Sequence, residues 1–516
     1  MAPRRIKAYG HLNARLILLG EAGGKDENKA GLPFVGLSGD LLFGPGKWLY
    51  KVGLKREDFW IDNVYPFQPP GNKLFLVNKD ELAKWTENLH ERLAKLEDPW
   101  LIVPTGETAL KALTGKTGIG KHRGSIYEYI DRRDRHIKVI PTYHPAFTFR
   151  DPLAVKTCLA DWKRINEDRH FRELRLPERE HFINPTFNDL QWYSTVVAAE
   201  SRKSKNKCLY EGLHDDPHFS MAIDLEWTTD KILMTGFSCD PAFSFTVPTT
   251  EEFWKGKKKL AEVMKWIKMM CQCDVPKIFQ HGHSDTYILK YWHSIDVKNW
   301  HWDTLAEHHC LDPNRPHTLQ YMASIDTRQP YWKDEAKNPE EIAKYANNFT
   351  ALSTYNGIDC CVERELHGLY IQKITERGLL DFYRQHYAAT FEPLLRLMLH
   401  GVRVDAELSR RRKAFLIADC IDLQDRLTAV VGEKVHGKKS LSGKKLMKFF
   451  YEDEKCAQIL RTRHKKGGDK VRTLSVDEVA VRRLMLKYAD KKPRVVEVGE
   501  LVLKHRRKYI LSGFYG

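Results

Sequence analysis

Hydrophobic and polar positions along the chain change their rhythm between regions. Residues 12–165 alternate short apolar runs with stretches of helical periodicity, and the apolar runs predict strands at 15–19, 100–103 and 137–140. The amphipathic stretch at 79–96 predicts a helix. Alternating strands and helices are typical of a layered α/β fold, which we expect here.

A second α/β block is predicted at 184–385, followed by a largely helical region at 386–516. Residues 166–183 are dense in Arg, Glu and His and contain Pro177, so we interpret them as a linker. Within the helical region, the polar, glycine-containing stretch at 464–470 predicts a hairpin. The expected fold class is therefore a multidomain α/β protein with a helical carboxy-terminal segment.

Composition narrows the class of protein. Apolar residues make up 42% and charged residues 29%, a balance typical of globular proteins. No run of 18 apolar residues occurs, and no apolar stretch follows the basic amino terminus, so we expect neither a membrane-spanning helix nor a secretory signal. Ten cysteines without disulfide or zinc spacing indicate a reducing compartment, the cytoplasm, or the host cytoplasm for a viral protein.

Positive charge is concentrated near the carboxyl end. Of the net charge of +16, residues 401–516 contribute 29 Lys and Arg against 15 Asp and Glu, whereas residues 1–400 hold 55 against 53. This asymmetry favours binding of a polyanion such as nucleic acid. A basic surface that serves only solubility is the alternative.

The first candidate site begins where a predicted strand ends in a glycine-rich, acidic loop from Gly20 to Glu27. Backbone N–H groups of such a loop can approach a flat or anionic ligand. Phe34 lies between turn residues, where its ring can face a ligand. Asn63 offers one donor and one acceptor, as reading a base edge requires, and His144 lies in a stiff turn after a strand.

Four motifs in this order resemble the family 4 uracil-DNA glycosylases. They are Gly20-Glu21-Ala22, GxPFVGxSGxLL beginning at Gly31, Asn63-Val64 and Pro141-Thr142-Tyr143-His144-Pro145. The resemblance implies an α/β/α glycosylase domain at 1–165 that flips uracil out of DNA into a pocket.

The resemblance also implies a role for each motif residue. Phe34 would stack on the uracil and Asn63 would hydrogen-bond its edge. Glu27 would be the acid that positions or activates water, and His144 would stabilise the negative charge on the departing uracil. The pocket loop would comprise Gly20, Glu21 and Ala22.

Two features depart from this family's pattern. Gly23 stands where the family usually has proline, which we expect to loosen the loop. Many members hold an iron–sulfur cluster on four cysteines, but the first cysteine here is Cys158, so no such cluster is expected. An inactive or merely uracil-binding relic is the alternative to a working glycosylase.

The second candidate site is a set of carboxylates. Asp224 and Glu226 lie two residues apart on a predicted strand at 220–227 and therefore share a face. Neighbouring carboxylates repel unless cations bridge them, which suits divalent metals, although such a pair on a strand also occurs by chance. Asp285 precedes a predicted helix, and Tyr355 and Asp359 are spaced to share one helical face.

This set resembles the DEDDy 3′–5′ exonucleases, specifically the proofreading domain of family A DNA polymerases. The resemblance implies an RNase H-like fold for residues 184–385, with Tyr355 helping to place the attacking water. His281 stands where the family usually has asparagine, and Ser284 where it has an aromatic residue. Two Mg²⁺ or Mn²⁺ ions would be held by four carboxylates, those of Asp224, Glu226, Asp285 and Asp359.

Residues 386–516 resemble part of the thumb of family A polymerases, which grips the DNA backbone. The polymerase metal and nucleotide motifs do not follow, so this chain is not expected to polymerise DNA. We expect a bacteriophage protein that combines uracil excision with proofreading, with DNA and a separate chain carrying palm and fingers as partners. The alternative is a non-catalytic DNA-binding or docking subunit of a replicative polymerase with a relic glycosylase fold.

Overall fold

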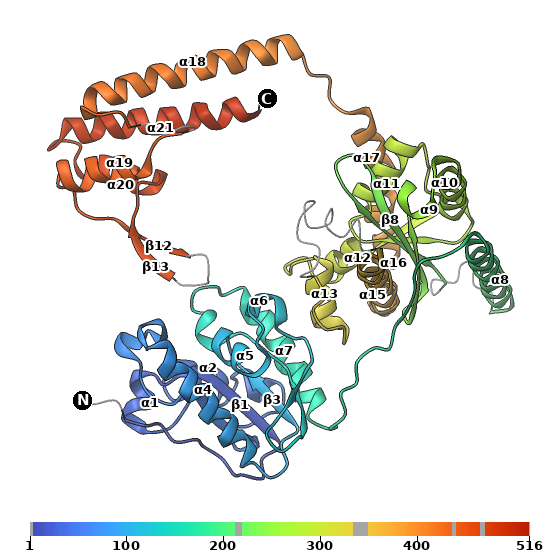
Figure 1. Cartoon of the computed structure of the whole chain (residues 1–516), viewed down its shortest axis with the longest axis horizontal. Coiled ribbons are helices and arrows are strands. Elements are labelled where there is room, and N and C mark those ends of the chain that lie inside the picture. Colours follow the sequence, from blue (N-terminus) through green and yellow to red (C-terminus); the bar gives the residue numbers. More distant parts are fainter. Residues whose placement is uncertain (1–3, 212–218, 334–348, 436–439, 465–469, 515–516) are drawn as a thin grey trace. The chain divides into compact units, whose positions relative to one another are not determined.

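The chain divides into two compact units, Met1–His400 and Gly401–Gly516, whose elements are labelled in Figure 1. The first unit contains two separate sheets, and the second contains helices and a two-stranded sheet. The predicted mixed α/β fold with a helical carboxy-terminal region is confirmed. This computed structural model describes residues 4–211, 219–333, 349–435, 440–464 and 470–514.

The first sheet has the strand order β2-β1-β3-β5-β4, and its neighbouring strands are parallel except for β4 and β5. The three predicted strands are confirmed, with β1 extending further than predicted. The five strands are β1 (Leu16–Ala22), β2 (Phe59–Tyr65), β3 (Leu101–Pro104), β4 (Tyr127–Ile130) and β5 (His136–Val139).

Helices cover both faces of this sheet. Successive residues of a strand point to opposite faces, and the buried strands are apolar on each face, so both faces need to be covered. Leu18 of β1 packs in the core that includes α7 (Ala154–Asp168), whereas Leu19 packs in the core that includes α4 (Lys79–Ala94). The helix predicted at 79–96 is thereby confirmed. The other helices are α1 (Lys25–Ala30), α2 (Leu37–Leu42), α3 (Trp48–Lys51), α5 (Glu107–Thr114) and α6 (Ile119–His122).

The second sheet has the order β11-β10-β7-β8-β9-β6. Strand β7 runs antiparallel to β8 and parallel to β10. Strand β6 lies within the predicted linker at 166–183 and pairs with β9. The six strands are β6 (Glu180–Phe182), β7 (Met221–Trp227), β8 (Ile232–Asp240), β9 (Phe243–Pro248), β10 (Lys277–Phe279) and β11 (Trp300–Asp303).

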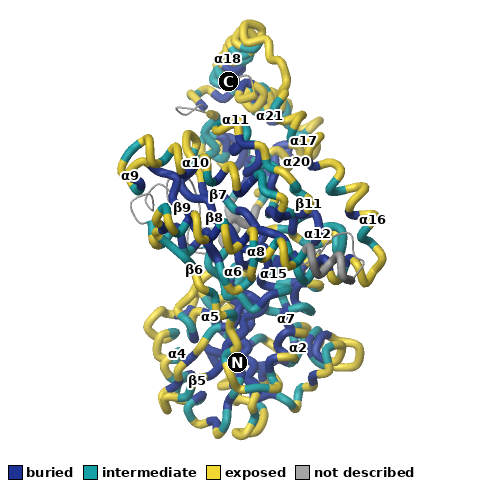
Figure 2. Tube along the Cα trace, turned by 90° about the vertical axis from the view of Figure 1, so that its right-hand side faces the viewer, coloured by how far each residue is buried: buried dark blue, intermediate teal, exposed yellow. Residues whose placement is uncertain are grey.

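The two faces of β7 have different partners. Ile223 packs in the core that includes α8 (Phe187–Glu211) and α10 (Lys257–Gln272), whereas Ala222 packs in the core that includes α15 (Phe349–Glu376). Figure 2 shows this buried interior in dark blue. Further helices among the described residues of this unit include α9 (Glu251–Trp254), α11 (His283–His293), α12 (Thr304–Leu311), α13 (Leu319–Asp326), α16 (Leu380–Tyr383) and α17 (Ala389–His400).

The carboxy-terminal unit is built around two long helices, α18 (Ala406–Val431) and α21 (Pro493–Phe514), which lie side by side in Figure 1. They share an apolar core with the shorter elements of the unit. Strands β12 and β13 pair antiparallel on either side of the predicted hairpin turn, of which residues 465–469 lie outside the described residues. The shorter elements include α19 (Gly443–Met447), β12 (Leu460–His464), β13 (Lys470–Leu474) and α20 (Glu478–Lys487).

Among the described residues, none of the helices is both long enough and apolar enough to cross a membrane.

Candidate active sites

The first candidate site lies at the carboxyl ends of β1 and β2. Strands β2 and β3 flank β1 on opposite sides, and ligands of open α/β sheets bind at such a change of strand order. A Cβ atom on Gly20 would lie 2.1 Å from Asn63 Oδ1 and 2.8 Å from Phe34 Cε2. The structure therefore brings these three predicted residues together, and only glycine fits at position 20.

His144 completes this group from the turn after β5. Its ring centroid lies 6.0 Å from that of Phe34. The Ala146 N–H donates to His144 Nδ1 at 3.3 Å, and burial, with a smaller effect of the Arg150 charge, lowers the pKa of His144 to about 4. The neutral ring therefore carries its proton on Nε2, which can donate to a ligand.

Asn63 lies in β2 and is 2% exposed. Its Oδ1 lies against Gly20, and hydrogen bonding from Asn63 favours the charged form of Glu27. However, Asn63 Nδ2 has no hydrogen bond of ordinary geometry to any described residue. An amide nitrogen carries two N–H donors, and a buried donor without a well-formed hydrogen bond costs about 1–3 kcal/mol, so Nδ2 can also donate to a ligand acceptor.

Glu27 lies in α1 and is buried. Its Oε2 accepts a hydrogen bond from Gly24 N–H at 2.6 Å, and its Oε1 accepts one from Phe34 N–H. Burial raises the pKa of this carboxyl group, and the two N–H groups partly offset the rise. Glu27 therefore joins the glycine-rich loop to the turn that carries Phe34.

Arg56 is a further residue of this site that sequence reasoning missed. Its guanidinium donates to Phe34 O at 2.9 Å and to Pro33 O at 2.6 Å. It also lies over the rings of Tyr9 and Phe43, 4.7 Å from each ring centre. Phe34 adopts a φ of 52°, which is unfavourable for a bulky residue, so this clamp holds a strained turn. Arg56 lies outside the sequence motifs, and no sequence signal identified it.

The other two predicted residues of the pocket loop are placed differently. Glu21 Oε2 accepts a hydrogen bond from Thr108 Oγ1 of α5 at 2.9 Å, so this carboxylate is already engaged by a protein partner. Ala22 is the last residue of β1, opposite Tyr65 of β2. Glu21 and Ala22 therefore shape the loop, whereas Phe34, Asn63 and His144 present side chains to the site.

Gly23 does not loosen the loop, and our expectation on this point was wrong. Its N–H donates to Phe67 O at 3.1 Å and to Tyr65 O at 3.3 Å. Proline has no N–H and could not form these bonds. A Cβ on Gly23 would also lie 2.1 Å from Ile6 Cδ1, so the loop is fixed by backbone hydrogen bonds and close packing.

The cysteine content of this domain does not fit an iron–sulfur cluster. Such a cluster needs four thiolates in most proteins. Cys158 of α7 is the one cysteine in the first 168 residues of the sequence, and it is fully buried in the apolar core. Burial raises the pKa of its thiol, which disfavours the thiolate form.

The second candidate site lies between β7 and α15. Carboxylate oxygens of Asp224 and Glu226 on β7 and of Asp359 on α15 all lie within 4.8 Å of one another. Burial, and then the charge of Asp359, raises the pKa of Asp224 to about 7, and the pKa of Glu226 is also raised, first by burial and then by Asp224. A set of carboxylate oxygens at this spacing fits a hard divalent cation.

Asp285 and Tyr355 border this cluster. Asp285 lies in the first turn of α11, outside the group of three, and burial followed by the charge of Asp224 raises its pKa. Tyr355 lies one turn before Asp359 on α15, and its hydroxyl accepts a hydrogen bond from Lys333 Nζ at 2.9 Å. The structure thus brings all five predicted residues to one region, with three of them in direct proximity.

Two buried residues of α15 were missed from the sequence. Asn356 Nδ2 donates to Asp224 Oδ2 at 2.6 Å and fixes that carboxylate. Glu363, one turn beyond Asp359, is 0% exposed, and neither of its oxygens has a hydrogen-bond partner among the described residues. The spacing of Glu363 from Asp359 was visible in the sequence, but its direction into the site was not.

The backbone conformation at position 281 explains why histidine can stand there. His281 adopts a φ of 59°, a left-handed conformation that asparagine and histidine tolerate better than most residues. Asp303 accepts hydrogen bonds from the N–H groups of His281 at 3.1 Å and Gly282 at 2.8 Å. These bonds fix the turn that leads into α11 and Asp285.

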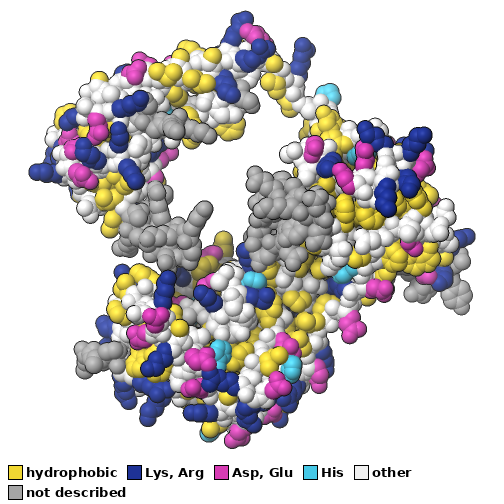
Figure 3. Space-filling model, in the orientation of Figure 1, with side chains coloured by type: hydrophobic (Ala, Val, Ile, Leu, Met, Phe, Trp, Pro, Cys, Tyr) yellow, Lys and Arg dark blue, Asp and Glu magenta, His cyan; other side chains and the backbone are white. Residues whose placement is uncertain are grey.

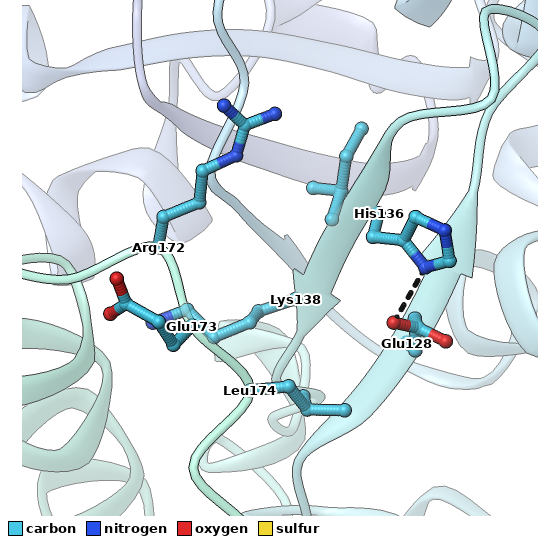
Figure 4. A pocket seen from close by; sticks show the side chains of 7 residues that line it. Glu128, His136, Lys138, Arg172, Glu173 and Leu174 are labelled. Carbon is cyan, nitrogen blue, oxygen red and sulfur yellow. Dashed lines mark hydrogen bonds and ion pairs between the residues drawn. The ribbon is translucent and has the colours of Figure 1, made fainter.

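A separate pocket of about 210 Å³ lies at the amino end of β5, beside β4 (Figure 4). Its His136 Nδ1 is paired with Glu128 Oε1 at 2.8 Å, and Lys138 Nζ donates to Asp168 O at 2.6 Å. These polar groups satisfy one another, and the pocket lies at the opposite strand end from Gly20. We therefore assign it no function.

Comparison with known proteins identifies the first domain. The sequence model of the uracil-DNA glycosylase superfamily matches residues 7–168. The type-4 uracil-DNA glycosylase of Archaeoglobus fulgidus is 33% identical over 167 residues, or 31% of this chain and 80% of that protein. The enzyme of the same name from Thermotoga maritima is 36% identical over 150 residues, or 28% of this chain and 72% of that protein. Through this domain, the chain belongs to the type-4 uracil-DNA glycosylase family.

A longer match extends beyond that domain. The DNA polymerase of Bacillus phage SP01 is 32% identical over 436 residues, which are 78% of this chain and 45% of the polymerase. The chain therefore spans less than half the length of this relative. The polymerase domain of Pol1 from M. smegmatis, solved with DNA primer-template and dNTP, has a TM-score of 0.37 at 14% identity over 58% of this chain and 45% of that one, which is too low to establish a shared fold.

Proposed function

We propose that this protein acts on DNA with two active sites: a glycosylase in residues 1–165 that removes uracil, and a metal-dependent 3′–5′ exonuclease in residues 184–385. Membership of the type-4 family supports the first activity, as does the Asn63 Nδ2 donor, which has no hydrogen bond of ordinary geometry among the described residues. The carboxylate cluster on β7 and α15 supports the second. Similarity to a phage polymerase supports a role in DNA replication.

In the glycosylase site, the flipped uracil would stack on Phe34, and Asn63 Nδ2 would donate to its edge. The bond between C1′ of the sugar and N1 of uracil breaks, and the electron pair passes to the base. His144 Nε2–H would donate to the uracil oxygen on which charge develops, and the imidazole ring would be neutral when it does so.

Water then adds to C1′, and the proton that it loses neutralises the uracil anion. Glu27 is the candidate to orient this water, because burial raises its pKa and each of its oxygens retains a lone pair beyond the observed N–H bond.

In the exonuclease site, Asp224, Glu226 and Asp359, with Asp285 beside them, would hold two divalent ions. Bound metal would supply an activated water and stabilise charge on the leaving 3′ oxygen. Tyr355 would orient the attacking water, and Asn356 would hold Asp224 in place through its hydrogen bond. We assign an RNase H-like fold to this domain, on the basis of the carboxylate arrangement on β7 and α15.

The carboxy-terminal unit would bind the DNA backbone as a partial thumb. Figure 3 shows many Lys and Arg side chains on the visible surface of this unit. We propose a separate chain with palm and fingers as a partner for DNA synthesis. Co-purification of a polymerase fragment that carries those parts would test this.

A second candidate function is a non-catalytic DNA-binding or docking subunit. The ion pair between the Lys333 ammonium and Asp359 favours this second function, because the lysine can compensate part of the carboxylate charge in place of a metal.

One gel assay tests both activities. A 5′-labelled strand with one internal uracil is incubated in EDTA or in Mg²⁺ and then treated with alkali, beside a uracil-free strand. Alkali-dependent cleavage at uracil in EDTA establishes the glycosylase, and a ladder shortening from the 3′ end in Mg²⁺ alone establishes the exonuclease. Asp224→Ala serves as the matched control, since it removes the ladder and spares uracil release. Absence of both products favours the docking subunit.

A further inference from the structure

Residues 324–333, which we call the bridging segment, contact both domains of the first unit. The segment starts within α13 and continues to Lys333. Its contacts on one side are with the glycosylase domain, and its last two residues contact the carboxylate cluster. It therefore connects the two proposed activities physically.

The start of the bridging segment is held by two buried arginines of the glycosylase domain. Arg123 Nη1 donates to Ser324 Oγ at 2.8 Å. Arg164 donates to the carbonyl oxygens of Ser324 and Ile325, in each case at 2.7 Å. A Cβ on Gly124 would lie 2.6 Å from Ser324 O, so the two backbones approach closely here.

The middle of the bridging segment is also held by polar and aromatic contacts. Arg328 forms an ion pair with the buried carboxylate of Asp168 at 2.7 Å. The Tyr331 N–H donates to Ser125 Oγ at 3.1 Å, and the Tyr331 ring meets the His122 ring edge-on with a centroid separation of 5.0 Å. The glycosylase domain thus fixes the backbone two residues before Lys333.

The end of the segment lies in the exonuclease site. Trp332 Nε1 donates to Asp359 Oδ1 at 2.7 Å. Lys333 Nζ is paired with Asp359 Oδ2 and donates to the Tyr355 hydroxyl at 2.9 Å. Both oxygens of one predicted metal ligand are therefore occupied by donors from the bridging segment.

We propose that Lys333 is a built-in counter-ion of the exonuclease site, which the glycosylase domain holds in place through the bridging segment and which divalent metal must displace. This inference rests on the proposed exonuclease function. The Lys333 ammonium compensates part of the negative charge of three carboxylates that lie within 4.8 Å of one another. It also makes metal occupancy depend on a contact with the other domain.

Lys333 and a metal ion exclude each other for electrostatic and steric reasons. A divalent ion lies about 2.0–2.6 Å from its carboxylate ligands. An ammonium bonded to the same Asp359 oxygen would then lie within about 4 Å of the ion, where like charges repel strongly in a buried site. Metal binding therefore requires Lys333 to leave, and every contact that holds Lys333 opposes metal binding.

The test measures Mn²⁺ affinity of the full chain without DNA, by calorimetric titration, in wild type, Lys333→Met and a matched control. Lys265→Met is the control, because Lys265 is an exposed lysine of α10 in the same domain, paired with Glu262 at 2.9 Å. We expect the Kd for Mn²⁺ to fall about tenfold or more in Lys333→Met, since a competing charge is removed, and to be unchanged in Lys265→Met. An equal or weaker affinity of Lys333→Met would overturn the proposal.

A second variant tests the part played by the glycosylase domain. Ser125→Ala removes the hydrogen-bond acceptor for Tyr331 N–H but leaves both active sites intact. We expect it to lower the Kd for Mn²⁺ about threefold in the wild-type background and to have no effect in the Lys333→Met background. Equal effects in both backgrounds would show that the bridging segment does not act through Lys333.

The outcomes also separate this inference from the proposed exonuclease. If wild type degrades DNA in Mg²⁺ but Lys333→Met binds Mn²⁺ no more tightly, the inference fails and the exonuclease stands. If neither variant binds Mn²⁺ and no ladder forms, both fail together.

Discussion

At the scale of single residues, the glycosylase site depends on one strained side chain. Phe34 is buried with a positive φ, and three hydrogen bonds from two residues fix its turn: Glu27 accepts from its N–H, and Arg56 donates to its carbonyl and to that of Pro33. Backbone strain of this kind costs about 1–3 kcal/mol and persists only where surrounding bonds enforce it. The position of the Phe34 ring is therefore set by residues that need not touch uracil.

We predict that Arg56→Ala reduces kcat/KM for uracil release about 10- to 100-fold, because a misplaced stacking ring loses alignment of the base. Arg56→Lys should retain less than half of the activity, since an ammonium cannot donate to two carbonyl groups with the same planar geometry. Single-turnover assays on uracil-containing DNA measure this. Arg15→Ala, which removes an exposed arginine stacked on Trp100, is the control. Equal rates for all variants would contradict a positioning role.

His144 leads to a prediction about pH. Its pKa of about 4 means that the ring is neutral at pH 5 and above. We therefore expect uracil release to show no inflection near pH 6.5, the ordinary pKa of histidine, and His144→Ala to reduce the rate about 100- to 1000-fold across this range. A wild-type pH–rate profile with a step near 6.5 that disappears in His144→Ala would instead indicate catalysis by a charged imidazolium.

At the scale of elements, β7 and α15 bring the carboxyl groups of Asp224, Glu226 and Asp359 together in the interior of the domain. The pKa of Asp224 is raised from an ordinary 3.8 to about 7, chiefly by burial. Between these values the folded protein keeps a proton that the unfolded chain has released, so the free energy of unfolding falls as pH rises. We predict that in EDTA the Tm falls by about 5 °C or more between pH 4.5 and 7.5.

Metal should reverse this trend, because Mn²⁺ binds the deprotonated carboxylates and binding raises stability. Asp224→Asn should flatten the slope in EDTA and abolish the Mn²⁺ effect. Thermal unfolding over this pH range measures both. A Tm in EDTA that rises with pH over the same interval would contradict the buried, protonated site.

The sequence predicts these elements better than it predicts their contacts. Apolar runs identify β1, β3 and β5, and the two-residue spacing of Asp224 and Glu226 places both on one face of β7, because local periodicity determines these features. Arg56 and Lys333 carry no local signal, since their roles arise from contacts across more than 20 residues of sequence. Gly23 was misjudged because its N–H bonds to Phe67 and Tyr65 depend on how two distant loops meet.

At the scale of the whole molecule, the two sites share one compact unit, and the basic residues 401–516 form another with its own core. If the proposed activities hold, the bridging segment gives the first unit a means of linking them, and we expect the charge of the second unit to supply non-specific DNA affinity. That unit has 29 Lys and Arg against 15 Asp and Glu. Attraction of this kind releases counter-ions and therefore weakens as salt rises.

We predict that a chain ending at His400 retains uracil release and 3′–5′ degradation in low salt but binds duplex DNA more weakly. A plot of the logarithm of the association constant for duplex DNA against the logarithm of salt concentration should have a shallower slope than for the full chain. The difference should be about 0.9 for each phosphate contact that residues 401–516 supply. Fluorescence anisotropy from 50 to 200 mM salt measures the slope, and circular dichroism checks that the shortened chain is folded. Identical slopes would place the DNA contacts in the first unit, and the excess charge of residues 401–516 would then serve solubility or a protein partner.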